Sequence, residues 1–260
     1  MRRAPAPAKI NLALVVGPRR DDGRHEVLTV LQRVDLVDRI ELAAAPGLRV
    51  EGFAGDTLVR RALEELARAA AVEPRWRVRI EKRIPLAAGL GGGSSDAATA
   101  LRLANATLPR PLAEAELRRI AARLGADVPF FLADGPQLGS GDGSRLSPLG
   151  LPQDFWVVLV LPAGAAKTAT ADVYAAFDAR AGADGWEARR RALLDGLARV
   201  ERARDLAALP PNDLARSPHA DTLRAHGAFR ADVSGAGPTV YGLFHRRDDA
   251  KRAGAAVKGL

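Results

Sequence analysis

The alternation of hydrophobic and polar positions predicts strands in the first third of the chain. Residues 6–16 form an apolar stretch that Lys9 and Asn11 interrupt, and residues 28–42 alternate over a length suited to one or two strands. Residues 76–82 alternate again and end shortly before a proline. A period of two places successive side chains on opposite faces of a sheet, which is typical of half-buried strands.

Apolar residues at helical spacing predict helices between and after these strands. In residues 56–72 they fall at Leu58, Ala62, Leu66 and Ala70, and an aspartate stands where the helix would begin. This spacing places them on one helix face, and aspartate is favoured at a helix start. The further predicted helices are residues 94–108, 112–124, 168–178, 184–204 and one that closes the chain.

The second half of the chain adds strands and a candidate domain boundary. Residues 155–161 are a continuous apolar run, which predicts a buried strand, and two short strands are predicted on either side of a turn at residues 234–238. Strands and helices mix without a strict repeating order, so we expect an α+β protein with helices packed against mostly antiparallel sheets. Residues 135–152 are rich in glycine, serine and proline, which favours a boundary there. We therefore expect two domains, residues 1–148 and 149–260.

Composition narrows the class of protein. The chain has 260 residues, of which 47% are hydrophobic, a proportion typical of globular proteins. Cysteine is absent, which excludes disulfides, cysteine–zinc sites, iron–sulfur clusters and a thiol nucleophile. No apolar run approaches the roughly 20 residues that span a bilayer, and the N-terminus lacks the apolar core of a signal peptide. We expect a soluble cytoplasmic protein with no membrane partner.

The net charge of +8 raises the possibility of a nucleic-acid partner. The arginines, however, are scattered along predicted helices and stand beside acids, as in residues 60–65 and 187–191, a pattern typical of solvated, salt-bridged helix faces. A basic nucleic-acid-binding protein would need clustered bases interleaved with exposed aromatic residues, and aromatic residues make up 5% of the chain. We expect no nucleic-acid partner, and a positive field that favours anionic small substrates.

A glycine-rich loop carries the strongest chemical signal. Between a predicted strand and a predicted helix, residues 89–93 contain four glycines, so backbone N–H groups can approach a phosphate closely. The helix expected to begin near Ser94 adds its unpaired amides, and Ser94 and Ser95 can cap that helix or contact a phosphate or Mg²⁺. The spacing fits neither a P-loop nor a dinucleotide fingerprint. The pattern predicts a phosphate cradle of another type; the alternative is a tight turn whose glycines serve geometry only.

The loop and four other stretches resemble one enzyme family. The pattern Pro-x-x-x-Gly-Leu-Gly-Gly-Gly-Ser-Ser, which begins at Pro85, resembles the ATP-binding motif of the GHMP kinases. The resemblance implies a two-domain fold, with an N-terminal domain like the second domain of ribosomal protein S5 and a ferredoxin-like C-terminal domain. The other matching stretches are residues 7–12, 22–26, 125–131 and 234–239.

The resemblance also implies a substrate. Residues 7–12, 22–26 and 125–129 match the GHMP kinases that transfer the γ-phosphoryl group of ATP to the 2-hydroxyl of 4-diphosphocytidyl-2-C-methyl-D-erythritol, in the non-mevalonate isoprenoid pathway. Its implied cofactors are ATP and Mg²⁺, and we expect a monomer or weak homodimer. A GHMP kinase of the homoserine or mevalonate type remains the alternative.

Two residues of opposite charge are the expected catalytic pair. Lys9 would on its own be interpreted as a strand-edge lysine and Asp127 as a helix-capping aspartate. The resemblance implies instead that Lys9 is the catalytic lysine and Asp127 the base that accepts the proton of the attacking hydroxyl. It also implies that Asn11, two residues along the same strand face, contacts the substrate. An ammonium there would offset charge on the carboxylate and on the transferring phosphoryl group.

The expected substrate-binding residues come from two stretches. The resemblance implies that His25, otherwise a plain turn histidine, recognises the cytosine ring by hydrogen bonds. The family usually has a tyrosine that stacks on the cytosine where this chain has Arg24, whose guanidinium plane can also stack on a base. By the same resemblance, Tyr174 lies on the other side of the base. Tyr174 could otherwise be a core helix residue, and Thr170 belongs to the same matching stretch.

The expected ATP contacts surround the glycine loop. No acidic cluster identifies a Mg²⁺ ligand, and phosphate oxygens, water and Ser95 would suffice. Thr57 stands where the family commonly has asparagine near the adenine, and residues 234–239 are expected to pack near the loop. By the resemblance, the residues expected to bind ATP are Lys82, Pro85, Gly89, Leu90, Gly91, Gly92, Gly93, Ser94 and Ser95; for Lys82 the alternative is a strand-end surface lysine.

Overall fold

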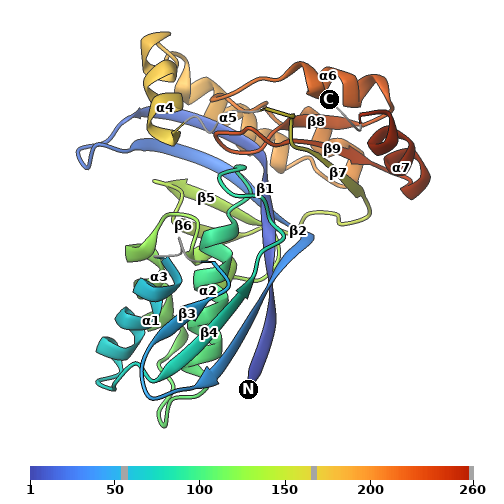
Figure 1. The fold of residues 1–260 in the computed structure, drawn as a ribbon. Helices are drawn as coiled ribbons and strands as arrows, with labels where there is room; N and C mark the ends of the chain where they lie inside the picture. The colour runs from blue at the N-terminus through green and yellow to red at the C-terminus, as the bar shows by residue number, and fades with distance from the viewer. Residues whose placement is uncertain (54–57, 165–168, 258–260) are drawn as a thin grey trace. The chain divides into compact units, whose positions relative to one another are not determined.

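The structure is a computed structural model that describes residues 1–53, 58–164 and 169–257 (Figure 1). The chain folds into two compact units, each built from several stretches of sequence. The first unit comprises Met1–Lys9, Arg33–Leu86 and Gly91–Asp134, and the second comprises Ile10–Gln32, Ala87–Leu90 and Gly135–Leu260. The expected division of the sequence at residue 148 stays a prediction.

Two long strands pass from one unit into the other. β1 (Arg2–Arg19) and β2 (His25–Ala44) confirm the predicted strands and extend them at both ends, with β2 as one strand instead of two. In the first unit, β2 pairs antiparallel with β4 (Trp76–Glu81), which pairs parallel with β3 (Arg49–Glu51). In the second unit, β2 pairs antiparallel with β5 (Gln137–Gly141).

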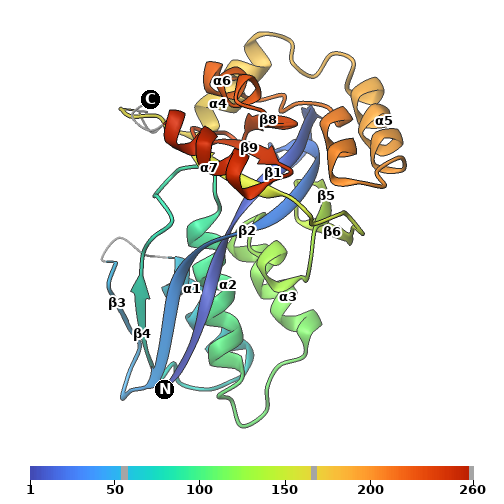
Figure 2. The ribbon, with the colours of Figure 1, turned by 90° about the vertical axis from the view of Figure 1, so that its right-hand side faces the viewer.

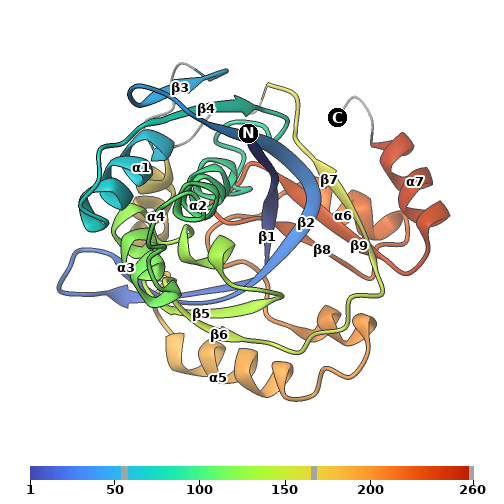
Figure 3. The same cartoon turned by 90° about the horizontal axis from the view of Figure 1, so that it is seen from below.

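The helices of the first unit cover the apolar face of its strands. Along β4 the side chains alternate strictly, with Trp76, Val78 and Ile80 buried. Figures 2 and 3 show α1 and α2 on one side of β3 and β4. Of the predicted face of α1, Ala62 and Leu66 are fully buried and Leu58 is half-buried, while Ala70 follows the end of the helix. The aspartate expected at the helix start, Asp56, lies outside the described residues. The helices of this unit are α1 (Leu58–Ala69), α2 (Gly92–Asn105), α3 (Glu114–Leu124) and the 3₁₀ helix η1 (Pro129–Leu132).

The second unit contains a three-stranded antiparallel sheet in the order β7-β9-β8. The two strands predicted around the turn at residues 234–238 are confirmed as β8 and β9. Their apolar side chains pack with Val160 and Leu223 in one core. The elements of this unit are β6 (Arg145–Pro148), β7 (Trp156–Val160), β8 (Arg230–Val233), β9 (Val240–Phe244), α4 (Thr170–Ala179), α5 (Trp186–Leu197), η2 (Ala203–Ala208), α6 (Pro218–Ala225) and α7 (Arg247–Ala256).

Residues 135–152, expected to contain the domain boundary, begin where the last stretch of the first unit ends, and they form a hairpin of β5 and β6 in the second unit. Its glycines serve close packing: a Cβ on Gly139 would lie 2.8 Å from the carbonyl oxygen of Gly143, and Gly141 has a φ of +71°. The glycine-rich sequence is thus a consequence of strand geometry here.

Two further predictions for the second half were wrong in part. The strand predicted at residues 155–161 is not wholly buried, since Trp156 and Leu161 are 46% and 45% exposed. β7 lies at the edge of its sheet, and the Trp156 ring packs against the guanidinium of Arg247 at 5.4 Å. The helix predicted at residues 184–204 ends at Leu197 and is followed by η2, while α6 was not predicted.

Ion pairs on the helices confirm the interpretation of the charge pattern. Arginines pair with acids three or four positions away, as Arg118 does with Glu114 and Arg190 with Glu187. Exposed pairs of this kind contribute about 0.3–0.5 kcal/mol each. Among the described residues, no helix combines the length and the apolarity needed to cross a membrane.

A matched pair of leucines tests the core of the first unit. Replacing Leu63, which is fully buried on α1, by alanine should lower the free energy of unfolding by about 2–5 kcal/mol, because it leaves a cavity. Leu86→Ala, at a residue 61% exposed, should change it by less than about 0.5 kcal/mol. Urea unfolding checks both, and equal losses would show that α1 does not pack as described.

Candidate active site

Lys9 and Asp127 come together in the first unit. The Lys9 side chain is only 5% exposed on β1, and its ammonium lies 3.5 Å from the carboxylate of Asp127, which is 40% exposed. The interpretation of Lys9 as a strand-edge lysine that reaches solvent was therefore wrong. Burial of an ammonium is costly unless it is paired, and the carboxylate supplies that partner. The open side of Asp127 leaves it accessible to a ligand.

The turn that carries Asp127 is held by its neighbours. Asp127 lies between the end of α3 and η1, and the residue before η1 is Val128, with no side-chain cap. The capping interpretation of Asp127 was therefore wrong. The rings of Phe130 and Phe131 follow directly, buried and packed edge to face at 5.1 Å. These two rings anchor the turn and fix where the carboxylate lies.

The glycine loop approaches Lys9 closely. Gly91 precedes α2 with a φ of +68°, and a Cβ there would lie 3.0 Å from Cγ of Lys9 and 3.0 Å from Cζ of Phe131. Gly91 is therefore required by backbone conformation and by space. Gly93 is exposed and has nothing near its absent Cβ, so packing does not require a glycine there. Its open backbone fits the approach of a ligand, and the geometry-only alternative does not account for it.

The first turn of α2 offers hydrogen-bond donors without partners in the helix. The helix begins at Gly92, two residues earlier than predicted, so Ser94 and Ser95 lie inside its first turn and do not cap it; that part of the prediction was wrong. The first helical bond runs from the N–H of Ser95 to the carbonyl of Gly91 at 2.9 Å. The Ser95 hydroxyl is buried and has no hydrogen-bond partner among the described residues. Unpaired amides and this hydroxyl suit an anion such as a phosphate.

Lys82 lies between two fully buried carboxylates. Its ammonium is 2.5 Å from Asp38 on β2 and 2.7 Å from Asp96 on α2. The second oxygen of Asp38 accepts the backbone N–H groups of Arg83 and Ile84, at 2.5 and 2.8 Å. Lys82 is thus no surface lysine: it ties the first turn of α2 to β2 and to the segment before the glycine loop. Its contact with ATP stays a prediction.

Two carboxylates, those of Asp38 and Asp96, share the single ammonium of Lys82. Burial lowers the pKa of Lys82, but its hydrogen bonds with the two carboxylates outweigh burial, and the net pKa is raised. Burial raises the pKa of Asp96 to about 7 against the opposing effect of Lys82. One oxygen of Asp96 has no hydrogen-bond partner among the described residues. Sequence reasoning missed Asp38 and Asp96, although an aspartate within the predicted strand at residues 28–42 was a usable signal.

In the second unit, residues 234–239 pack against Ala87–Leu90, as expected. The Ser234 hydroxyl donates to the carbonyl of Gly89 at 3.0 Å, and the N–H of Thr239 donates to the carbonyl of Ala88 at 3.3 Å. A Cβ on Gly89 would lie 2.3 Å from the Ser234 carbonyl oxygen, so only glycine fits. Leu90 is buried beside it.

Asn11 lies in the second unit, two residues beyond Lys9 along β1. Its carboxamide donates to the Thr29 hydroxyl at 2.8 Å, and its backbone N–H lies 3.4 Å from the Ser234 hydroxyl. In the first unit, Pro85 is half-buried. Substrate contact by Asn11 and nucleotide contact by Pro85 stay predictions.

His25 and Tyr174 form an aromatic pair in the second unit. Their rings stack with centroids 4.8 Å apart, and Phe177 meets the imidazole edge to face. The imidazole is buried, so the interpretation as a plain turn histidine was wrong, and its Nε2 lies 2.7 Å from Asp178. The hydrogen bond with His25, aided by Arg19, holds the pKa of Asp178 below its ordinary value.

The other two predicted substrate residues of this group, Arg24 and Thr170, are not part of the aromatic pair. Arg24 forms an ion pair with Asp142 in the β5–β6 turn, and its side chain is 59% exposed. Thr170 is the exposed first residue of α4. Thr57, expected near the adenine, lies outside the described residues. Within residues 1–53, 58–164 and 169–257, no group of three histidine or acidic side chains could hold a metal ion.

Two family models match parts of the chain, and relatives match nearly all of it. A model of the GHMP kinases N terminal domain matches residues 57–135, and one of the GHMP kinases C terminal region matches residues 220–259. The chain is 41% identical over 97% of its length to the 4-diphosphocytidyl-2-C-methyl-D-erythritol kinase of Anaeromyxobacter sp. (strain Fw109-5), of which it covers 85%. It is 37% identical over 97% of its length to the enzyme of that name from Geobacter sulfurreducens (strain ATCC 51573 / DSM 12127 / PCA), of which it covers 93%.

Among solved structures, an enzyme of the same name also matches this chain. A crystal structure of 4-(cytidine 5'-diphospho)-2C-methyl-D-erythritol kinase has a TM-score of 0.81 and 34% identity, over 99% of this chain and 95% of that one. The mevalonate kinase of Methanococcus jannaschii has a TM-score of 0.74, over 99% of this chain and 94% of that one. At 12% identity, that second likeness shows a shared fold alone.

The titration of Asp96 yields a testable pH dependence. Because its pKa is raised to about 7 in the folded protein, the carboxyl should make folding less favourable as pH rises from about 4 to 7. Asp96→Asn removes that titration, so the variant should match the wild type below about pH 4 and be more stable near pH 8 by about 2–4 kcal/mol. Urea unfolding at several pH values measures the difference.

Asp221→Asn is the control for this titration, since it removes an exposed carboxylate on α6. It separates the loss of one negative charge from the loss of the buried carboxylate. A constant difference between Asp96→Asn and the wild type over this pH range would show that Asp96 is ionised throughout and would contradict the assignment.

Proposed function

This chain belongs to the 4-diphosphocytidyl-2-C-methyl-D-erythritol kinase family of the GHMP kinases, and we propose that it phosphorylates the 2-hydroxyl of 4-diphosphocytidyl-2-C-methyl-D-erythritol. The family makes it an ATP-dependent small-molecule kinase. The choice of acceptor and the roles of individual residues are the proposal.

The observation that carries the proposal is the position of Lys9. Its ammonium pairs with Asp127 at 3.5 Å, while its aliphatic stem lies against Gly91 at the start of α2. A carboxylate, an ammonium and the open first turn of a helix thus lie close together within one unit. Phosphoryl transfer needs this combination, because the enzyme must orient the nucleophile and offset charge on the moving phosphoryl group.

In the proposed reaction, the oxygen of the 2-hydroxyl attacks the γ-phosphorus of ATP. The bond from that phosphorus to the bridging oxygen breaks, ADP leaves, and the hydroxyl proton passes to Asp127. A loose transition state asks more for orientation than for a strong base, so an ordinary carboxylate suffices. Lys9 holds the carboxylate in place and offsets negative charge as the phosphoryl group moves.

The proposed nucleotide site is the glycine loop with the first turn of α2. The phosphates of ATP would accept hydrogen bonds from the backbone N–H groups of Gly92, Gly93 and Ser94. Ser95 fits a phosphate oxygen or Mg²⁺, because its buried hydroxyl has no partner among the described residues. Mg²⁺ bound with ATP would neutralise part of the phosphate charge. Lys82 would act chiefly by holding this turn.

The proposed cytidine site is the aromatic pair of the second unit. Asp178 fixes the orientation of the His25 ring, and Tyr174 supplies a flat surface on which aromatic groups pack. Arg24 is committed to Asp142, so its guanidinium would have to leave that ion pair to stack on a base. Asn11 and Thr170 complete the proposed substrate contacts.

We also propose a cytoplasmic monomer or weak homodimer without nucleic-acid or membrane partners. The arginines are dispersed over several helices and paired with neighbouring acids, as on α3 and α5. Arginines paired with neighbouring acids serve solvation of helix faces more than binding of a polyanion.

A panel of acceptors tests the proposed function. With ATP and Mg²⁺, the wild type should phosphorylate 4-diphosphocytidyl-2-C-methyl-D-erythritol and leave homoserine and mevalonate unchanged. Asp127→Asn should lower kcat by about 10²–10⁴-fold, because the hydroxyl proton loses its acceptor, while ATP still binds. Asp221→Asn should match the wild type. Turnover of homoserine or mevalonate instead would refute the proposed acceptor, and a loss below tenfold in Asp127→Asn would refute its role as base.

The aromatic pair predicts a selective effect on the acceptor. Tyr174→Leu removes the ring that stacks on His25, and the KM for the cytidyl substrate should rise by about three- to tenfold while the KM for ATP stays unchanged. Phe229→Leu is the matched control, since Phe229 stacks on His245 at 4.4 Å elsewhere in the same unit. Equal effects of the two variants on both KM values would exclude a cytidine site at Tyr174.

A further inference from the structure

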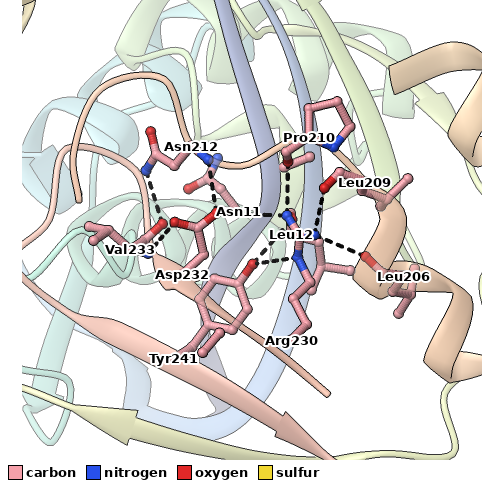
Figure 4. Close-up of polar contacts among 12 residues, drawn as sticks. Asn11, Leu12, Leu206, Leu209, Pro210, Asn212, Arg230, Asp232, Val233 and Tyr241 are labelled. Carbon is pink, nitrogen blue, oxygen red and sulfur yellow. Dashed lines mark hydrogen bonds and ion pairs between the residues drawn. The ribbon is translucent and has the colours of Figure 1, made fainter. Parts of the chain in front are cut away.

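A buried polar network lies beneath the loop at residues 234–239 (Figure 4). At its centre is Asn212, which is 3% exposed and lies between η2 and α6. Its carboxamide nitrogen donates to the carbonyls of Val233 and Gly235, at 2.9 and 2.6 Å. Its carboxamide oxygen accepts the N–H of Leu214 at 2.8 Å. One side chain thus holds the carbonyls on either side of Ser234.

Asn212 is itself fixed by strands of the second unit. Its backbone N–H donates to the buried carboxylate of Asp232 on β8 at 2.8 Å. Arg230, two residues earlier on the same strand, holds the segment before Asn212 through the carbonyls of Leu206, Leu209 and Pro210. Asn212 therefore has little freedom to move relative to β8.

The same network reaches β1. The guanidinium of Arg230 also donates to the hydroxyl of Tyr241 on β9 at 3.2 Å, and that hydroxyl donates to the carbonyl of Leu12 at 3.1 Å. Figure 4 shows these groups converging from separate strands. Buried polar networks in which the members are paired are rigid, because each lost bond leaves a desolvated group unpaired. The loop therefore rests on a rigid base.

Residues 234–239 in turn hold Ala87–Leu90, the part of the glycine loop that lies in the second unit. Ser234, between the two carbonyls that Asn212 holds, donates to Gly89, and Thr239 donates to Ala88. Gly89 has no room for a methyl group against the Ser234 carbonyl. A shift of residues 234–235 would therefore displace Ala87–Leu90.

We propose that Asn212 is a positioning residue for ATP binding: its carboxamide fixes residues 233–235, which in turn fix the glycine-loop carbonyls of Ala88 and Gly89. The proposal rests on the proposed function, since it takes the glycine loop as the nucleotide site. Asn212 is 3% exposed and acts through residues 233–235. Its loss should loosen the loop and weaken ATP binding more than acceptor binding, because the Ser234 hydroxyl bonds to Gly89 at 3.0 Å and accepts only a longer bond, of 3.4 Å, from the backbone of Asn11.

Asn212→Ala and Asn212→Ser test the proposal. The serine hydroxyl can still accept the N–H of Leu214 as a local turn, so Asn212→Ser keeps the fold, but it cannot reach both loop carbonyls. Both variants should raise the dissociation constant and the KM for ATP by about tenfold or more, and the KM for the cytidyl substrate by less, since the loop meets the acceptor residues only through the 3.4 Å bond from Asn11 to Ser234. Calorimetric titration with ATP and Mg²⁺ measures binding independently of turnover.

Asn105→Ala is the matched control. Asn105 in the first unit is 8% exposed, and its carboxamide likewise bonds to both the N–H and the carbonyl of one residue, Leu112. It should lower the melting temperature about as much as Asn212→Ala and leave ATP binding unchanged. Unchanged ATP binding in Asn212→Ser, or an equal loss in Asn105→Ala, would overturn the positioning role alone. Failure of the wild type to bind ATP would overturn the proposed function and this role with it.

Discussion

A buried ammonium on a strand with both faces covered is the constraint from which the active site follows. β1 is buried continuously from Ala8 to Gly17, so Lys9 has no route to solvent from the strand edge. An unpaired charge there would be costly, and Asp127 supplies the partner. Because Asp127 pairs with Lys9 on one side and is exposed on the other, this ion pair satisfies the buried ammonium and leaves open the carboxylate that we propose as the base.

Buried polar groups also support the two parts of the glycine loop. In the first unit, Lys82 joins Asp38 to the first turn of α2 through Asp96. In the second unit, Asn212 sets the carbonyls around Ser234. The polar atoms of both clusters are largely buried. Each cluster fixes the position of a backbone segment: the first turn of α2 in one case and the carbonyls around Ser234 in the other. Phosphate binding by amides depends on such support, because a backbone donor is only as well placed as the segment that carries it.

The sequence predicted most elements whose apolar pattern was regular, such as β4 and α1. It did not predict the β5–β6 hairpin, where glycines have a packing role, and it failed where an edge strand exposes apolar residues such as Trp156. In the site, motifs predicted Lys9, Asp127 and the loop. They could not predict Asp96 or Asn212, because pairing between buried groups from distant segments has no local pattern and appears only after folding.

We propose that Lys9 and Asp127 act as one unit in phosphoryl transfer. A double-mutant cycle with Lys9→Met, Asp127→Asn and the combined variant, measured as kcat with the cytidyl substrate, tests this joint role. Residues that act together have strongly non-additive effects, so we expect the combined variant to be within about threefold of the slower single variant. Losses that multiply in the combined variant would show instead that the two groups act independently.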